Sequence, residues 1–153
     1  MATNERPTLG NFMSLTCFQY LRVGTEEVAD RAPIVASGRK RGYDLIESLQ
    51  LLGASEDSGL IQSKLEEALG AKGTRLCLVK SIIQKSKGSY EVHLAEGACT
   101  AGQVSSTPIC AFTLGVFIGA LHAITGIPMR GHEVACVACG SKECIYVIEA
   151  VAL

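Results

Sequence analysis

The sequence carries almost no net charge and no long run of like charge. Among its 153 residues, 14 Lys and Arg nearly balance 15 Asp and Glu, which leaves a formal charge of −1. A near-neutral chain in which 48% of the residues are hydrophobic is typical of a compact folded domain. We therefore expect neither disorder nor a nucleic-acid partner, and we interpret the short run Arg39-Lys40-Arg41 as a solvated helix face.

The sequence also shows no export signal. Residues 1–7 lack the basic-then-apolar pattern of a signal peptide, so we expect a cytoplasmic protein. In that compartment the seven cysteines should be mostly reduced. A chain of this length can bury one core without disulfides, and a single domain is expected.

Charged residues are missing between Glu96 and Arg130, and residues 108–127 are almost wholly apolar. About 20 apolar residues are long enough to cross a bilayer. This segment, however, contains two threonines, one histidine and several small residues, and strand-like sequence follows it directly. We predict a fully buried central helix and no membrane span.

Helical periodicity appears in two further segments. Apolar residues and glycines recur at three- and four-residue steps from Ile34 to Leu52, between a helix start at Thr25 and a stop at Gly53. A second helix is predicted from Asp57-Ser58 to Gly70. The apolar segment Phe12 to Val23 has no assignable type. We expect residues 1–24 to be a leading segment and residues 25–153 to form one ligand-binding domain.

Strand patterns fill the remaining parts of the chain. Apolar residues alternate in 76–83 and 90–94, with a turn at Lys87-Gly88-Ser89, and two β-branched stretches flank a turn at Gly140-Ser141. The order helix-helix, strand-strand, helix, strand-strand predicts an α+β fold, with an antiparallel sheet of about four strands packed with helices.

The last hairpin carries a distinctive residue pattern. A glutamate precedes Cys-x-x-x-Gly-x-x-x-Cys-x-aromatic, here at Glu133, Cys136, Gly140, Cys144 and Tyr146. This pattern resembles the signature of the 4-vinyl reductase (4VR) domain family. The segment 38–47 and the apolar helix are also similar to that family and to its structural relatives, the Bet-type subunits of the TRAPP vesicle tether.

The resemblance implies a small, commonly dimeric domain that holds a hydrocarbon-like or tetrapyrrole-related ligand between helices and sheet. In a photosynthetic source it implies an accessory role in pigment or photosystem biogenesis, with an assembly partner. The sequence has no Gly-x-Gly-x-x-Gly loop, which an autonomous reductase would need for its nucleotide. We therefore expect a non-catalytic binding domain. The alternatives are a tetrapyrrole vinyl-reductase subunit with redox thiols and an interaction module with a vestigial pocket.

The apolar helix has one face of small residues. Projected at 100° per residue, Ala111, Gly115, Gly119 and His122 share one stripe. This stripe predicts either close packing against another helix or a slot for a thin ligand. In the second case His122 would face the ligand's polar head or coordinate a tetrapyrrole metal.

Cys110 lies at the start of the same helix, just after Pro108. A helix amino terminus lowers the pKa of a thiol, so this cysteine is either a reactive group of the ligand site or a small core residue. We interpret Cys17, Cys77 and Cys99 as small core residues.

Four residues of the hairpin have the spacing of zinc ligands, namely His132, Cys136, Cys139 and Cys144. A regular strand through Cys136 and Cys139 would point the two thiols to opposite faces, which would prevent a shared ion. A turn at Val137-Ala138 would instead bring them together. Because β-branched residues dominate, we predict the strand, with Cys139 and Cys144 as a neighbouring pair.

A homodimer is expected from the helix within residues 34–52. Gly38 and Gly42 lie on the line of its apolar residues, so two copies of this helix could approach closely across a two-fold axis.

Overall fold

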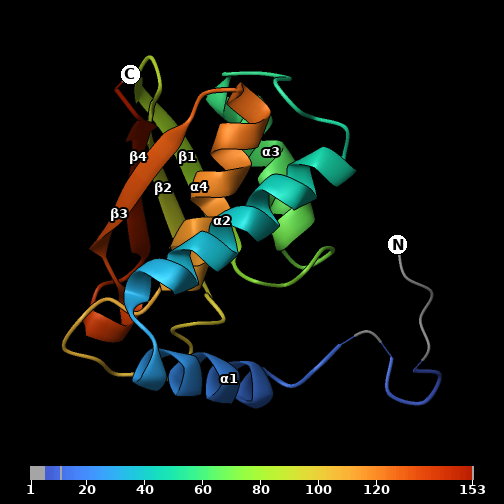
Figure 1. Cartoon of the computed structure of the whole chain (residues 1–153), viewed down its shortest axis with the longest axis vertical. Coiled ribbons are helices and arrows are strands. Elements are labelled where there is room, and N and C mark those ends of the chain that lie inside the picture. The colour runs from blue at the N-terminus through green and yellow to red at the C-terminus, as the bar shows by residue number, and fades with distance from the viewer. Residues whose placement is uncertain (1–5, 11, 153) are drawn as a thin grey trace.

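A four-stranded antiparallel sheet with helices stacked on one of its faces forms the body of the molecule (Figure 1). The structure is a computed structural model that describes residues 6–10 and 12–152. The elements are α1 (Leu15–Val28), α2 (Arg31–Ser48), α3 (Ser58–Leu69), β1 (Leu78–Ser86), β2 (Ser89–Ala95), α4 (Ala111–Thr125), β3 (Met129–Ala135) and β4 (Cys144–Ala150). The predicted α+β class is confirmed.

The strands lie in the order β1-β2-β4-β3, and each neighbouring pair is antiparallel. The first hairpin turns at Gly88, whose φ of 71° is readily available to glycine. Alternate residues of β2 and β4 point into the core, as Tyr90, Val92, Tyr146 and Ile148 show with no exposed surface. The predicted first hairpin is confirmed.

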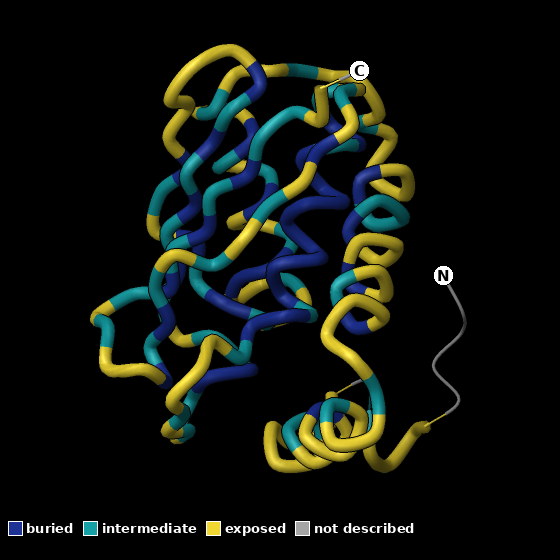
Figure 2. The backbone as a smooth tube through the Cα atoms, turned by 60° about the vertical axis from the view of Figure 1, so that its left-hand side comes forward, coloured by how far each residue is buried: buried dark blue, intermediate teal, exposed yellow. Residues whose placement is uncertain are grey.

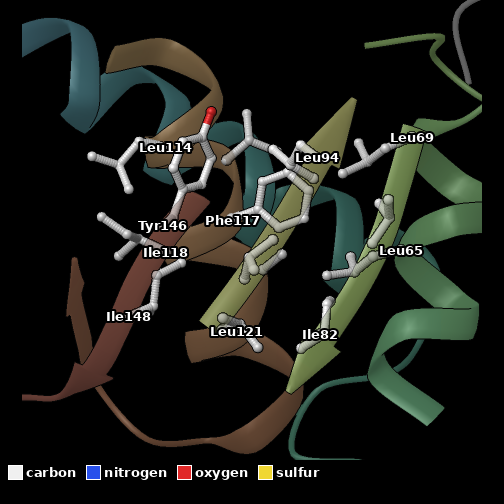
Figure 3. Packing of buried hydrophobic residues seen from close by; sticks show 14 of the residues in the cluster. Leu65, Leu69, Ile82, Leu94, Leu114, Phe117, Ile118, Leu121, Tyr146 and Ile148 are labelled. Atoms are coloured by element: carbon white, nitrogen blue, oxygen red, sulfur yellow. The ribbon is translucent and has the colours of Figure 1, made fainter. Parts of the chain in front are cut away.

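Helix α4 is the centre of the core and separates the sheet from α2 (Figures 1 and 2). Its side chains meet those of the sheet, and Phe117 packs edge to face on Tyr146 with ring centroids 6.1 Å apart (Figure 3). Within the described residues no helix is both long enough and apolar enough to span a bilayer. The prediction of a buried central helix is confirmed.

Helix α2 packs on the outer side of α4 through glycines on both helices. A Cβ atom at Gly38 or Gly42 would overlap the carbonyl oxygen of Phe112 or Val116, respectively. The two backbones therefore touch, and these glycines are buried inside one chain. This contact corrects the interface predicted for the homodimer, because the glycine line of α2 is already covered by α4.

Helix α1 lies apart from the stacked layers and covers one end of the body (Figure 1). It starts at the N-cap Ser14, whose hydroxyl accepts a hydrogen bond from the Cys17 amide at 3.2 Å. It therefore includes most of the unassigned segment 12–23 and continues across the predicted boundary at residues 24 and 25. Residues 1–5 and 11 of the leading segment lie outside the described residues.

The second hairpin differs from its prediction between the strands. β3 ends at Ala135, and Val137–Cys139 form a short 3-10 helix that Gly140 closes with a φ of 99°. The amides of Cys139 and Ser141 both donate to the Cys136 carbonyl, at 3.0 and 3.2 Å. The predicted strand through Cys136 and Cys139 is wrong, because these local hydrogen bonds outweigh the strand preference of one β-branched residue, Val137.

Candidate functional site

Three cysteine thiols from distant parts of the sequence meet inside the molecule. The sulfur atoms of Cys110, Cys136 and Cys144 all lie within 4.8 Å of one another, and all three residues are buried. The Sγ atoms of Cys110 and Cys144 are 3.7 Å apart. We call these three residues the thiol cluster.

Each thiol of the cluster lies at the end of a secondary-structure element. Cys110 is the N-cap of α4, Cys136 precedes the 3-10 turn, and Cys144 is the first residue of β4. The turn also directs the Val137 amide at Cys144 Sγ, with a distance of 3.4 Å. The cluster therefore depends on the tight turn that replaces the predicted strand.

The cluster has the donor set and spacing of a structural zinc site. Zinc binds thiolates at about 2.3 Å in a tetrahedron, which separates two ligand sulfurs by roughly 3.8 Å. The distance from Cys110 to Cys144 matches that separation. A hydrogen bond from the Cys110 thiol lowers the pKa of Cys144, while the same bond and burial raise the pKa of Cys110. The pair therefore favours one thiolate that shares a proton with its neighbour, and a cation could take that proton's place.

A buried carboxylate accompanies the three thiols. The Glu133 side chain is 1% exposed, accepts a hydrogen bond from the Cys110 amide at 2.9 Å and forms an ion pair with Arg31. Its charge acts on both Cys110 and Cys144. A short movement of this side chain would supply an oxygen as a fourth ligand. The Tyr146 hydroxyl is also buried beside Cys110 and has no hydrogen-bond partner among the described residues.

The zinc ligands predicted from the sequence are only partly brought together. Cys136 and Cys144 meet, but Cys139 and His132 are exposed and do not belong to the group of three sulfurs. The predicted neighbouring pair of Cys139 and Cys144 is therefore wrong. Cys110 takes the third position, which hairpin spacing could not reveal because this residue precedes α4.

The small face of α4 is filled by protein. A Cβ atom at Gly115 or Gly119 would overlap a carbonyl oxygen of α2, so neither glycine lines an open slot. The close-packing interpretation describes both positions. Ala111 is buried, and His122 packs edge to face on Tyr43 with ring centroids 5.3 Å apart.

A cleft of about 850 Å³ opens elsewhere, between α1, α2, α4 and the chain that leads into β1. We call it the α1 cleft. Its lining is mainly apolar and combines residues from these segments: Phe12, Met13, Leu15, Phe18, Leu45, Leu69, Leu76, Ala98, Ala101, Phe112 and Val116. Phe18 and Phe112 meet edge to face across it, with ring centroids 6.2 Å apart. A volume of this size suits a small organic molecule.

Charged residues line the α1 cleft together with the apolar ones. They are Arg41 and Asp44 on α2, Arg75 before β1, and Glu96 after β2. Arg75 and Glu96 have positive φ angles of 60° and 51°. Such backbone conformations are unfavourable for these residue types and cluster at functional sites. The cleft thus combines an apolar wall with cationic groups that a polar ligand end could contact.

A second groove of about 800 Å³ lies between α2 and β3. It is lined by Arg31, Arg39, His132 and Glu133 among others, so it is more polar than the α1 cleft. Cys110 and His122 do not appear in the lining of either space.

The sheet, the buried α4 and the cysteine hairpin define a small α+β domain of the ligand-binding type. The family model of the vinyl-4-reductase (4VR) domain, the family that the hairpin pattern resembles, matches residues 91–150. This match spans β2, α4, β3 and β4, and it confirms the predicted resemblance. No curated protein matches the chain.

Solved structures share the fold at low sequence identity. The phenol-responsive sensory domain of the transcription activator PoxR, solved with phenol, is 15% identical, with a TM-score of 0.70 over 92% of this chain and 77% of that one. A vinyl-4-reductase family protein from Methanocaldococcus jannaschii is 14% identical, with a TM-score of 0.66 over 93% and 84%. Trafficking protein particle complex subunit 3 from Naegleria fowleri, covalently bound to palmitic acid, is 14% identical, with a TM-score of 0.62 over 90% and 93%. The predicted relation to TRAPP subunits is confirmed at the level of fold.

Proposed function

We propose that this protein is a non-catalytic domain that binds an apolar small molecule in the α1 cleft. The observation that carries the proposal is the cleft itself, an apolar space of about 850 Å³ with arginines among its lining residues. The ligand class that fits is a lipid-like or aromatic molecule with one polar or anionic end. Its apolar body would contact Phe18 and Phe112, and its polar end would lie near Arg41 or Arg75.

The neighbouring structures support this ligand class. The PoxR sensory domain was solved with phenol and the Naegleria subunit with palmitic acid, and both molecules combine an apolar body with one polar group. Size is a second support, because burial of an apolar ligand contributes roughly 25 cal/mol per Å² of covered surface. A tetrapyrrole is the larger candidate, and a role in pigment or photosystem biogenesis, like the cytoplasmic location, stays a prediction from the sequence.

We further propose that zinc occupies the thiol cluster and stabilises the hairpin. Three buried sulfurs at tetrahedral spacing support this assignment, with Glu133 as the adjacent fourth donor. A closed set of four protein ligands is typical of structural zinc and leaves no position for a substrate. The metal would therefore support folding rather than chemistry.

The ligand proposal is tested with a probe and two matched substitutions. The probe is palmitate, measured by its displacement of 1-anilinonaphthalene-8-sulfonate fluorescence from the purified chain. Ala101→Phe places a ring in the α1 cleft, while Ala36→Phe makes the same change in the second groove. We expect Ala101→Phe to weaken palmitate binding at least about tenfold and Ala36→Phe to leave it unchanged, because only the first removes ligand volume.

Two outcomes would contradict the ligand proposal. One is palmitate affinity that falls equally in both variants, which would separate binding from the α1 cleft. The other is an absence of bound palmitate, phenol and protoporphyrin at millimolar concentration, which would favour the interaction module. Native mass spectrometry of the same samples shows whether the host cell already supplied a ligand.

A further inference from the structure

Helix α1 directs its polar residues toward the body and its apolar residues toward solvent. On the inner side, Arg22 is buried and pairs with Glu26 at 3.0 Å, and the Gln19 amide donates to the carbonyls of Ala98 and Ala101. On the outer side, Leu21 and Val28 are 67% and 86% exposed. This arrangement is the reverse of an ordinary surface helix, whose apolar stripe faces its own core.

The outer apolar residues have the spacing of a coiled-coil seam. Cys17, Leu21, Gly24 and Val28 follow one another at steps of four, three and four residues and share an arc of about 60° on the helix. All four are exposed, and no atom lies within 4 Å of a Cβ built at Gly24. None of the four is charged. We call them the α1 seam.

The seam fits a second copy of itself in the antiparallel direction. Antiparallel pairing places Leu21 of one helix opposite Gly24 of the other, so a large side chain meets an open position. It pairs Cys17 with Val28 in the same way. Parallel pairing would instead set Leu21 against Leu21 and leave a gap between two glycines.

The charges on α1 favour the same direction. The helix has no acidic residue in its first turn, while Glu26 and Glu27 lie near its end, where they oppose the helix dipole. An antiparallel partner brings Glu27 close to the amino terminus of the other helix, where the unpaired amides attract a negative charge. A parallel partner would bring the acidic ends together.

We propose that the α1 seam is the docking surface for α1 of a second copy of this chain, in an antiparallel, two-fold symmetric pair. One pair of 14-residue helices gives an interface at the small end of specific protein contacts. The dimer is therefore an exchanging one, with a dissociation constant in the range of about 1 to 100 μM. The proposal is independent of the ligand, since the seam lies on the side of α1 away from the body (Figure 2).

Sedimentation velocity of the full chain between about 5 and 300 μM tests the dimer. We expect Leu21→Glu to weaken association at least tenfold, because it places a charge in the seam. Leu60→Glu is the matched control, since Leu60 is an exposed leucine of α3 outside the seam, and it should associate like the unmodified chain. An unmodified chain that stays monomeric at the highest concentration, or a Leu21→Glu chain that associates normally, would overturn the proposal.

Disulfide trapping tests the direction. In a Cys139→Ser background, Val28→Cys should give a covalent dimer after mild diamide oxidation, through Cys17 of each chain and the new cysteine of the other. A further Cys17→Ser change should abolish this dimer. The same two residues of one helix are about 16 Å apart, so they cannot pair within a chain. Efficient trapping through Cys17 alone would show parallel helices and overturn the antiparallel arrangement.

Discussion

At the scale of single residues, the thiol cluster separates cysteines that composition makes equal. Burial raises the pKa of Cys77 to about 12 and also raises the pKa of Cys99, so these thiols stay protonated. In the cluster, the pKa of Cys144 is lowered by the hydrogen bond from Cys110. A thiolate is therefore most accessible where three sulfurs also converge, which is the arrangement that a metal ion needs.

The cluster predicts a specific pattern of zinc content. Protein purified without added metal should contain about one zinc per chain, and Cys110→Ser or Cys144→Ser should remove most of it because each takes away a ligand. Cys139→Ser and His132→Ala should keep it, since both residues are exposed. Inductively coupled plasma mass spectrometry measures the zinc. We also expect a strong chelator to lower Tm by about 5 °C or more, because metal binding is linked to folding.

Two results would disprove the zinc assignment. One is loss of zinc in His132→Ala or Cys139→Ser but not in Cys110→Ser, which would restore the hairpin ligand set. The other is metal-free protein with a disulfide between Cys110 and Cys144, which mass spectrometry after alkylation would reveal.

Sequence reasoning finds part of this site and misses part of it. The signature residues Glu133, Cys136, Cys144 and Tyr146 are recognisable because they lie close together along one hairpin. The sequence also places Cys110 at a helix start, but its position beside the hairpin follows only from how α4 packs on the sheet. The zinc spacing also favours Cys139, which the 3-10 turn carries to the surface.

At the scale of elements, the contact between α2 and α4 depends on glycines. The stripe on the apolar helix predicts that something approaches closely, and the sequence leaves open whether that is a backbone or a ligand. The structure answers with α2, since Gly115 and Gly119 face carbonyl oxygens of Val35 and Arg39. Helix ends are more predictable, because Asp57 and Gly70 carry the chemistry of a helix start and stop locally.

Adding one methyl group to this contact should weaken the fold. Gly119→Ala or Gly42→Ala forces the two helices apart, and overpacking of this kind typically costs about 1 to 3 kcal/mol. Ser37→Ala, at an exposed position of α2, should change the free energy of unfolding by less than about 0.5 kcal/mol. Urea denaturation followed by circular dichroism measures the difference. A Gly119→Ala chain as stable as the original would show that the helices do not touch there.

At the scale of the whole molecule, the chain divides into a packed body and the separate helix α1. The body has its own core, in which α4 is enclosed by the sheet, α2 and α3 (Figure 3). Helix α1 contributes little to that core, with Phe18 only partly buried against it. This division explains why the segment 12–23 has no assignable type from sequence, because its apolar residues do not mark a face that packs on the body.

Removal of α1 is therefore expected to separate binding from folding. A chain that starts at Asp30 keeps α2, α3, α4 and the sheet, so it should remain folded, and we expect its free energy of unfolding to fall by less than about 2 kcal/mol. The lost contacts are chiefly the pairing of Phe18 with Phe112, worth about 0.5 to 1.5 kcal/mol, and a few exposed hydrogen bonds. Palmitate binding should weaken at least about tenfold, because Leu15 and Phe18 form one wall of the cleft. Urea denaturation and fluorescence displacement measure the two effects. Unchanged palmitate affinity in the shortened chain would place the ligand elsewhere, and loss of cooperative unfolding would make α1 part of the core.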